Sequence, residues 1–117
     1  MFWIISLHFG AGMAQLGIYN EFYTNGILNI EAIYRNGKLH GEYIEYDQAG
    51  KPMKVCNYYN GVLHGDYYEY LNGVMTMRTT YSMGRMAGMI EKFYNNGHIK
   101  SKHSTIPAYD GAYCVLQ

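Results

Sequence analysis

Glycine recurs along this 117-residue chain at a fixed interval of 23 or 24 residues. Self-similarity at a period of 20–50 residues indicates a repeat protein, in which each unit buries its apolar surface against its neighbours. This periodicity restricts the fold more than the composition does. We interpret the glycines as turn markers that repeat with the units. They form three series: Gly17, Gly41, Gly65 and Gly88; Gly26, Gly50, Gly73 and Gly97; and Gly37, Gly61 and Gly84.

Asn-Gly pairs separate short segments within each unit. Both residues tolerate the positive φ angles that tight two-residue hairpin turns require. The segments between the pairs are rich in Tyr, Ile, Val, Thr and Met, which is typical of strands bounded by turns. No window combines a helix start signal with a sustained 3.6-residue apolar period. We therefore predict about two antiparallel strands per unit, with tight turns at 25–26, 36–37, 60–61, 72–73 and 96–97.

Aromatic residues recur at two positions of the first strand in each unit. Tyr43 and Tyr46 are three residues apart, so they are predicted to point to opposite faces of a regular strand. A sandwich would bury one face and leave the other polar, so the pattern instead predicts a single layer. The 14 tyrosines suit half-wet sites on both faces of such a sheet. The candidate partner-binding residues are Tyr19, Tyr43, Tyr46, Tyr67, Tyr70 and Phe93.

Two segments, YRNGKLHGEYIEY (34–46) and YYNGVLHGDYYEY (58–70), carry the clearest form of the repeat. Their shared pattern resembles the MORN repeat, in the variant found in bacterial antitoxin-like proteins and in repeat proteins of giant DNA viruses. The resemblance covers about residues 17–105, although Met83 and Ala87 replace the Asn and His of the earlier units. It implies an all-β fold: an elongated, twisted, single-layer antiparallel sheet of consecutive β-hairpins. It also implies an interaction scaffold without catalytic residues.

The chain divides into three segments by its match to the repeat. An array of about four units at 17–105 is flanked by residues 1–16 and 106–117, which we expect to cover the terminal edges of the sheet. Such edges expose unpaired backbone groups, which proteins either cover or use for contacts. The apolar N-terminal run is shorter than the roughly 20 residues that span a bilayer and lacks the basic start of a signal peptide. The candidate edge or self-association residues are Phe2, Trp3, Phe9 and Tyr113.

The charges of the chain balance but are distributed unevenly. Nine basic and nine acidic residues cancel, so we expect no nucleic-acid binding, which usually needs a basic stripe. No Lys or Arg precedes Arg35, whereas residues 85–103 carry four cations and one Glu. These acidic and basic ends would allow head-to-tail self-association. Cys56 and Cys114 are too few for a disulfide framework, so we expect a reducing location, the cytoplasm or a virion, and no secretion.

Repeated polar residues raise the question of catalysis and metal binding. His40 and His64 occupy equivalent positions two strands apart, about 9.5 Å, whereas zinc holds its ligands at about 2.0–2.3 Å. We therefore expect no metal site. Glu21, Glu45 and Glu69 form a column of similar environments, whereas a catalytic carboxylate pair needs two different environments. We interpret this column as a solvated stripe.

The remaining expectations concern function. Cys56 aligns with Ala32 and Thr79, so we predict a small packing residue and not a nucleophile. We expect no enzyme and no cofactor, but a protein–protein interaction scaffold that binds a partner or another copy. It would be a small structural component of a large assembly such as a giant-virus particle. The alternatives are a bacterial antitoxin or immunity-type binder, and a peripheral membrane protein that inserts Phe2, Trp3 and Phe9.

Overall fold

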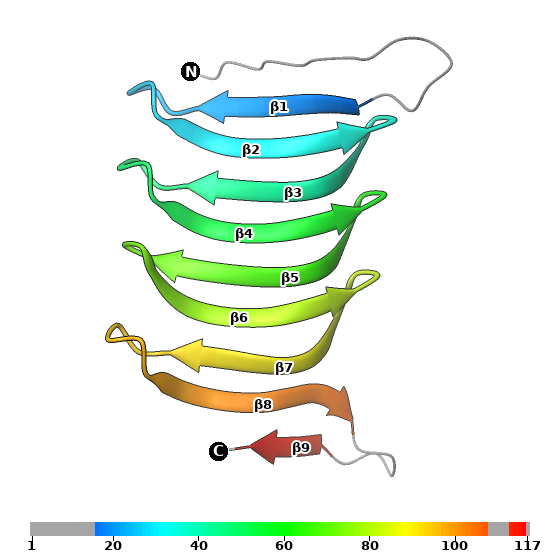
Figure 1. The fold of residues 1–117 in the computed structure, drawn as a ribbon, viewed down its shortest axis with the longest axis vertical. Coiled ribbons are helices and arrows are strands. Elements are labelled where there is room, and N and C mark those ends of the chain that lie inside the picture. The colour runs from blue at the N-terminus through cyan, green and yellow to red at the C-terminus, as the bar shows by residue number, and fades with distance from the viewer. Residues whose placement is uncertain (1–15, 108–112, 117) are drawn as a thin grey trace.

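The structure, a computed structural model, describes residues 16–107 and 113–116. Nine strands form one antiparallel sheet in which every strand pairs with its sequence neighbours (Figure 1). The molecule measures 50 × 36 × 17 Å, and its described part contains no helix. These observations confirm the predicted single-layer sheet of consecutive hairpins. The strands are β1 (Leu16–Phe22), β2 (Leu28–Arg35), β3 (Lys38–Tyr46), β4 (Pro52–Tyr59), β5 (Val62–Leu71), β6 (Val74–Ser82), β7 (Arg85–Phe93), β8 (Ile99–Pro107) and β9 (Tyr113–Leu116).

The structure describes only one of the two segments that we expected to cover the edges of the sheet. Phe2, Trp3 and Phe9 lie outside the described residues. At the other end, β8 extends to Pro107, two residues beyond the predicted end of the array, and β9 pairs with it. Tyr113 therefore belongs to the last strand of the sheet, although its side chain is not among those described.

Four hairpins close in two-residue turns whose residues both have positive φ. The first residue has φ of 46–51° and the second of 80–89°, as the primed hairpin turns require. Three of these turns are the predicted Asn-Gly pairs at 36–37, 60–61 and 72–73. The fourth is Met83-Gly84, where Met83 has φ of 47°. The pairing register therefore holds Met83 in a left-handed backbone conformation, which Gly and Asn adopt more readily than Met.

The predicted tight turns at 25–26 and 96–97 are wrong. In each pair only the glycine has positive φ, and the connection involves five residues. In the first connection, the N–H of Tyr23 donates to the carbonyl of Ile27 at 2.8 Å, and Asn25 Oδ1 accepts from the N–H of Ile27 at 2.9 Å. Asn25 therefore stabilises the wider turn through its side chain, a role that the Asn-Gly pair alone does not distinguish.

The interval of 23 residues has a local cause. Connections at 23–27, 47–51 and 94–98 have the same backbone hydrogen bonds, whereas β5 and β6 are joined by the two-residue turn at Asn72-Gly73. Every 23-residue interval between equivalent glycines contains this shorter connection. One residue has therefore been lost at one turn, and the strands on either side keep their register.

The first glycine series bends strands and does not mark turns, contrary to our interpretation. Gly41, Gly65 and Gly88 lie within β3, β5 and β7 with φ of 120°, 112° and 96°. The pairing shifts register beside each of them, as expected of β-bulges that bend a strand. Figure 1 shows the resulting curvature of these three strands. A side chain at Gly41 would also lie 3.4 Å from that of Ile33.

A thin core lies on one face, which we call the tyrosine face. Directly paired residues alternate large and small along it, and the small ones are at most 5% exposed. Neighbouring tyrosine rings pack at 5.3–5.9 Å between centroids and cover these small side chains. Cys56 is 0% exposed, which confirms its prediction as a small packing residue. The paired column comprises Tyr19, Ala32, Tyr43, Cys56, Tyr67 and Thr79.

The opposite face carries most of the ion pairs, and we call it the charged face. Tyr46 lies on it, because its hydroxyl donates to Glu31 Oε1 at 3.4 Å, and Glu31 pairs with Ile44. Ile44 alternates with Tyr43 along β3. Tyr43 and Tyr46 therefore point to opposite faces, as the spacing predicted.

Candidate interaction surfaces

A Tyr–Glu pair repeats along the tyrosine face. The hydroxyls of Tyr19, Tyr43 and Tyr67 donate to Glu21, Glu45 and Glu69 at 2.8, 3.1 and 2.8 Å. Burial, together with the adjacent carboxylate, raises the pKa of the Tyr43 hydroxyl far above its ordinary value. Each of the three carboxylates accepts the same hydrogen bond from the tyrosine two residues before it. The glutamate column is therefore a set of structural partners for the tyrosines and not the solvated stripe that we expected.

Lys54 lies between two of these pairs. Its Nζ is 3.3 Å from Glu45 Oε2 and lies 5.7 and 6.0 Å from the ring centroids of Tyr43 and Tyr67. Burial disfavours its charged form, but Glu45 outweighs that effect and raises the pKa of the ammonium. No repeat pattern predicts this contact, because Ile30 and Met77 occupy the equivalent positions in the neighbouring units. Only the cross-strand register places the cation there.

The thiol of Cys56 lies beneath this layer. Burial raises its pKa to about 11, which the nearby Lys54 partly opposes. A nucleophilic cysteine needs an accessible thiolate near neutral pH. Cys56 is buried and protonated at that pH, so its environment suits packing.

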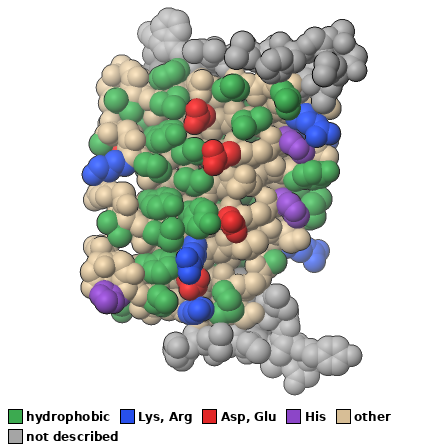
Figure 2. Space-filling view, in the orientation of Figure 1, with side chains coloured by type: hydrophobic (Ala, Val, Ile, Leu, Met, Phe, Trp, Pro, Cys, Tyr) green, Lys and Arg blue, Asp and Glu red, His purple; other side chains and the backbone are tan. Residues whose placement is uncertain are grey.

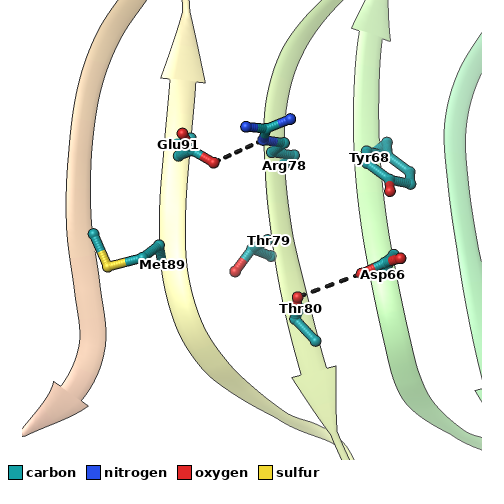
Figure 3. A pocket seen from close by; sticks show the side chains of 7 residues that line it. All are labelled: Asp66, Tyr68, Arg78, Thr79, Thr80, Met89 and Glu91. Atoms are coloured by element: carbon teal, nitrogen blue, oxygen red, sulfur yellow. Dashed lines mark hydrogen bonds and ion pairs between the residues drawn. The ribbon is translucent and has the colours of Figure 1, made fainter.

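An ion-pair cluster occupies the charged face near the C-terminal end (Figure 3). Arg78 Nε lies 2.7 Å from Glu91 Oε1, as Figure 3 shows. Lys102 Nζ lies 3.6 Å from Glu91 Oε2. The hydrogen bond from Arg78, together with both positive charges, lowers the pKa of the Glu91 carboxyl. The three residues are direct cross-strand partners on β6, β7 and β8, so sheet register alone brings them together.

A shallow hollow of about 270 Å³ adjoins this cluster. Asp66 and Tyr68 line it from β5, and Thr80 Oγ1 lies 3.5 Å from Asp66 Oδ1 (Figure 3). A second hollow, of about 200 Å³, lies towards the N-terminal end of the same face. Three isoleucines and two glutamates line it: Ile18, Ile33, Ile44, Glu31 and Glu42.

The six candidate partner-binding residues are divided between the two faces. Those of the paired tyrosine column lie on the tyrosine face, where Tyr67 is only 9% exposed. The other three, at the second aromatic position of each unit, lie on the charged face, where Phe93 lies under the guanidinium of Arg78 at 5.7 Å. No single surface contains all six. The first group is Tyr19, Tyr43 and Tyr67, and the second is Tyr46, Tyr70 and Phe93.

Sequence reasoning missed a third surface, formed where the β2–β3, β4–β5 and β6–β7 turns stack. The N–H of Asn60 donates to His40 Nδ1 at 3.2 Å, and Gly61 donates to the carbonyl of Leu39 at 2.7 Å. Met83 and Gly84 repeat both bonds one unit later, to His64 Nδ1 and Leu63. Each turn is therefore fixed on the preceding one. The available signal was the His-Gly dipeptide, followed about 20 residues later by the turn.

Aromatic contacts continue along these turns. The ring of Tyr59 lies between His40 and His64, at 4.9 and 6.0 Å between centroids. Figure 2 shows two histidines along one edge of the sheet with basic side chains above and below them. We call this surface the turn stripe; it comprises Lys38, His40, Tyr59, Val62, His64 and Arg85.

Within residues 16–107 and 113–116, no three His, Cys, Asp or Glu side chains come together as a metal site would require. The same part of the chain contains no helix of the length and hydrophobicity needed to cross a membrane.

Comparison with known proteins finds a family match over part of the chain. The family model of the MORN repeat variant matches residues 15–38 and 39–60. No curated protein and no solved structure matches the chain significantly. The matched residues cover β1 to β4, and β5 to β8 continue the same hairpin pattern.

Proposed function

We propose that this chain, a MORN-repeat protein by the match of residues 15–38 and 39–60, is a non-catalytic scaffold that binds a protein partner. MORN repeats are generally associated with protein interaction or membranes. The observation that carries the proposal is the number of large apolar side chains left exposed on a hydrogen-bonded sheet. Exposed apolar side chains indicate an interaction site where they adjoin one another, as Tyr59 and Val62 do at directly paired positions of β4 and β5. The most exposed are Leu71, Met83, Ile99, Tyr94 and Tyr59, at 46–58%.

The ionisable groups also support a non-catalytic role. Catalytic sites gather groups whose environments push their pKa values apart. Here the three Tyr–Glu pairs repeat one hydrogen bond, the pKa of all three tyrosines is shifted in the same direction, upward, and the thiol of Cys56 is buried. The hollow beside Glu91 is bordered by a carboxylate already neutralised by Arg78 and Lys102. These groups hold the sheet together and leave its surface for binding.

Within this function we favour a structural component of a large assembly, such as a giant-virus particle, acting in a virion or in the cytoplasm. Residues 1–34 carry two Glu and no Lys or Arg, whereas residues 85–103 carry four cations and one Glu, and this asymmetry supports contacts between copies. The alternative is a bacterial antitoxin that covers a toxin. Sedimentation at high concentration and low salt tests the first: concentration-dependent oligomers support it, and a monomer under all conditions contradicts it.

Site-specific photocrosslinking tests the scaffold function itself. A photoreactive phenylalanine analogue would replace Tyr59, Tyr70 or Tyr94, with Ala49 as the control position in an exposed loop. In a lysate of the cells in which the protein occurs, we expect a discrete protein adduct at one or more tyrosine positions and none at 49. Equal labelling at all four positions would contradict a specific scaffold. Co-sedimentation of the full chain with liposomes, without any protein adduct, would favour the membrane role instead.

A further inference from the structure

The turn stripe is a surface that is already ordered before any partner binds. Backbone hydrogen bonds between successive turns fix the positions of its side chains. A side chain at Gly61 would contact Lys38, and one at Gly84 would contact Val62, so the turns stack closely. A surface that is already ordered loses little conformational entropy when a partner binds.

The centre of the stripe is apolar and its ends are cationic. Tyr59 is 46% exposed and Val62 is 38% exposed. They lie on β4 and β5, between Lys38 on β3 and Arg85 on β7. Among the described residues, neither cation makes an ion pair. This contrasts with Arg78 and Lys102, which share Glu91 on the same sheet. The stripe therefore presents positive charge that no carboxylate within residues 16–107 and 113–116 neutralises in an ion pair.

The two histidines add N–H donors, which favour an anionic ligand as the cations do. Nδ1 of His40 and of His64 accepts a backbone N–H, so each neutral ring carries its proton on Nε2. An N–H donor beside a cation favours a carboxylate ligand. Glu42 and Asp66 are exposed two residues beyond these histidines, and they confine an acidic ligand to the turn side of the stripe.

The spacing of the stripe defines the length of its ligand. Lys38 begins β3 and Arg85 begins β7, so they are four strand spacings apart, about 19 Å. An extended peptide advances about 3.3 Å per residue. It would place two carboxylates against the two cations when roughly six residues separate them, with an apolar residue midway over Tyr59.

We propose that the turn stripe binds an extended acidic segment of a partner protein, with two carboxylates about six residues apart and an apolar side chain between them. This rests on the scaffold function and specifies the chemistry of the partner. The stripe fits a peptide better than a single-stranded nucleic acid. Nucleic-acid grooves follow the backbone with closely spaced positive charge, whereas here the cations are separated by the apolar centre.

Peptide display on the full chain tests this assignment. A library of random peptides of about 12 residues, long enough to span the stripe, is selected against the wild-type protein. The same selection uses K38E/R85E and the matched variant K51E/K92E, which changes the charge equally at exposed lysines elsewhere. We expect acidic, apolar-centred peptides from the wild type and from K51E/K92E. We also expect roughly tenfold weaker binding of those peptides by K38E/R85E, as for loss of complementary charges.

The outcomes separate this proposal from the scaffold function. Circular dichroism first confirms that all three proteins are folded. Peptides without acidic enrichment, unchanged binding by K38E/R85E, or displacement of the peptides by an oligo-dT probe would each overturn the assignment. A crosslinked protein partner that K38E/R85E retains would overturn the assignment but support the scaffold. Absence of a specific protein adduct in the crosslinking experiment, with acidic peptides still selected, would instead count against the scaffold alone.

Discussion

The backbone N–H of Met83 donates a hydrogen bond to Nδ1 of His64 at 3.0 Å, although 19 residues separate the two in sequence. Asn60 and His40 form the equivalent pair one unit earlier, at 3.2 Å. The histidine of the His-Gly dipeptide is therefore an acceptor for the first residue of the next turn. This contact explains a repeated histidine without a metal.

Replacing His64 by Ala should lower the free energy of unfolding by about 1 kcal/mol, because the N–H of Met83 loses its acceptor and Tyr59 loses a ring contact. Urea denaturation measures the change. His98→Ala is the control, since the hydrogen bonds recorded for His98 use its backbone. Equal destabilisation by the two variants would show that the turn-to-turn bond contributes nothing.

Met83→Asn should stabilise the protein by about 0.5–1 kcal/mol, because Asn tolerates the φ of 47° that Met83 adopts. The reverse change, Asn60→Met, should destabilise the equivalent turn by a similar amount. Thermal unfolding of both variants measures the effects. A lower melting temperature for Met83→Asn would mean that packing of the sulfur side chain outweighs backbone strain.

Gly41→Ala should cost more than about 2 kcal/mol, because φ of 120° is unfavourable for an L-residue and the new methyl group would crowd Ile33. Gly26→Ala is the comparison, with φ of 87° and nothing within 4 Å, and should cost about 1 kcal/mol. Chemical denaturation ranks the two. The reverse order would indicate that the strand bend at Gly41 is not fixed by its glycine.

Glu91→Gln should cost about 1–2 kcal/mol at neutral pH, through loss of charge-assisted hydrogen bonds. This is less than for a fully buried pair, because the Arg78 side chain is 50% exposed. The pKa of Glu91 is lowered in the native state. Its contribution is therefore complete above the ordinary carboxyl pKa of about 4.3 and is lost as the pH falls through the lower native value.

The difference between wild type and Glu91→Gln should accordingly shrink on acidification, which denaturation at several pH values measures. Glu42→Gln, at an exposed position of the same face, should change little at any pH. A gap between wild type and Glu91→Gln that persists at low pH would assign the effect to packing.

Cys56 should resist thiol reagents in the folded protein, because it is 0% exposed and burial raises its pKa to about 11. A Cys114→Ser background leaves Cys56 as the remaining thiol. Labelling should then require unfolding by denaturant and should follow the opening of the sheet. Rapid labelling under native conditions would place Cys56 in an accessible site.

The sequence predicted the sheet because its strongest signals are local. Asn60-Gly61 specifies its turn through backbone preference alone, and the spacing of Tyr43 and Tyr46 specifies two faces through strand alternation. Asn25-Gly26 shows the limit, because its turn is stabilised by a hydrogen bond that Asn25 Oδ1 accepts from the N–H of Ile27, which the dipeptide does not reveal.

The candidate surfaces were less predictable, because they depend on residues brought together across strands. Lys54 contacts two tyrosines only through register, and no repeat column contains a second lysine at its position. The turn stripe depends in the same way on contacts between residues about 20 positions apart. The repeat shows which positions are equivalent in successive units. The chemistry of each surface depends on the individual residues that differ from the repeat.

The shortened turn at Asn72-Gly73 has an evolutionary consequence. It lies at the edge opposite the stacked turns, where the backbone bonds of each connection are internal to it. Side chains link successive connections there, since the Tyr23 hydroxyl and Asn25 Nδ2 donate to the carbonyls of Tyr46 and Gln48. A length change at this edge breaks no backbone bond between units, whereas a deletion at Asn60-Gly61 would remove backbone bonds to the preceding unit. The molecule thus has a permissive margin and a constrained one, and natural or designed insertions will accumulate on the former.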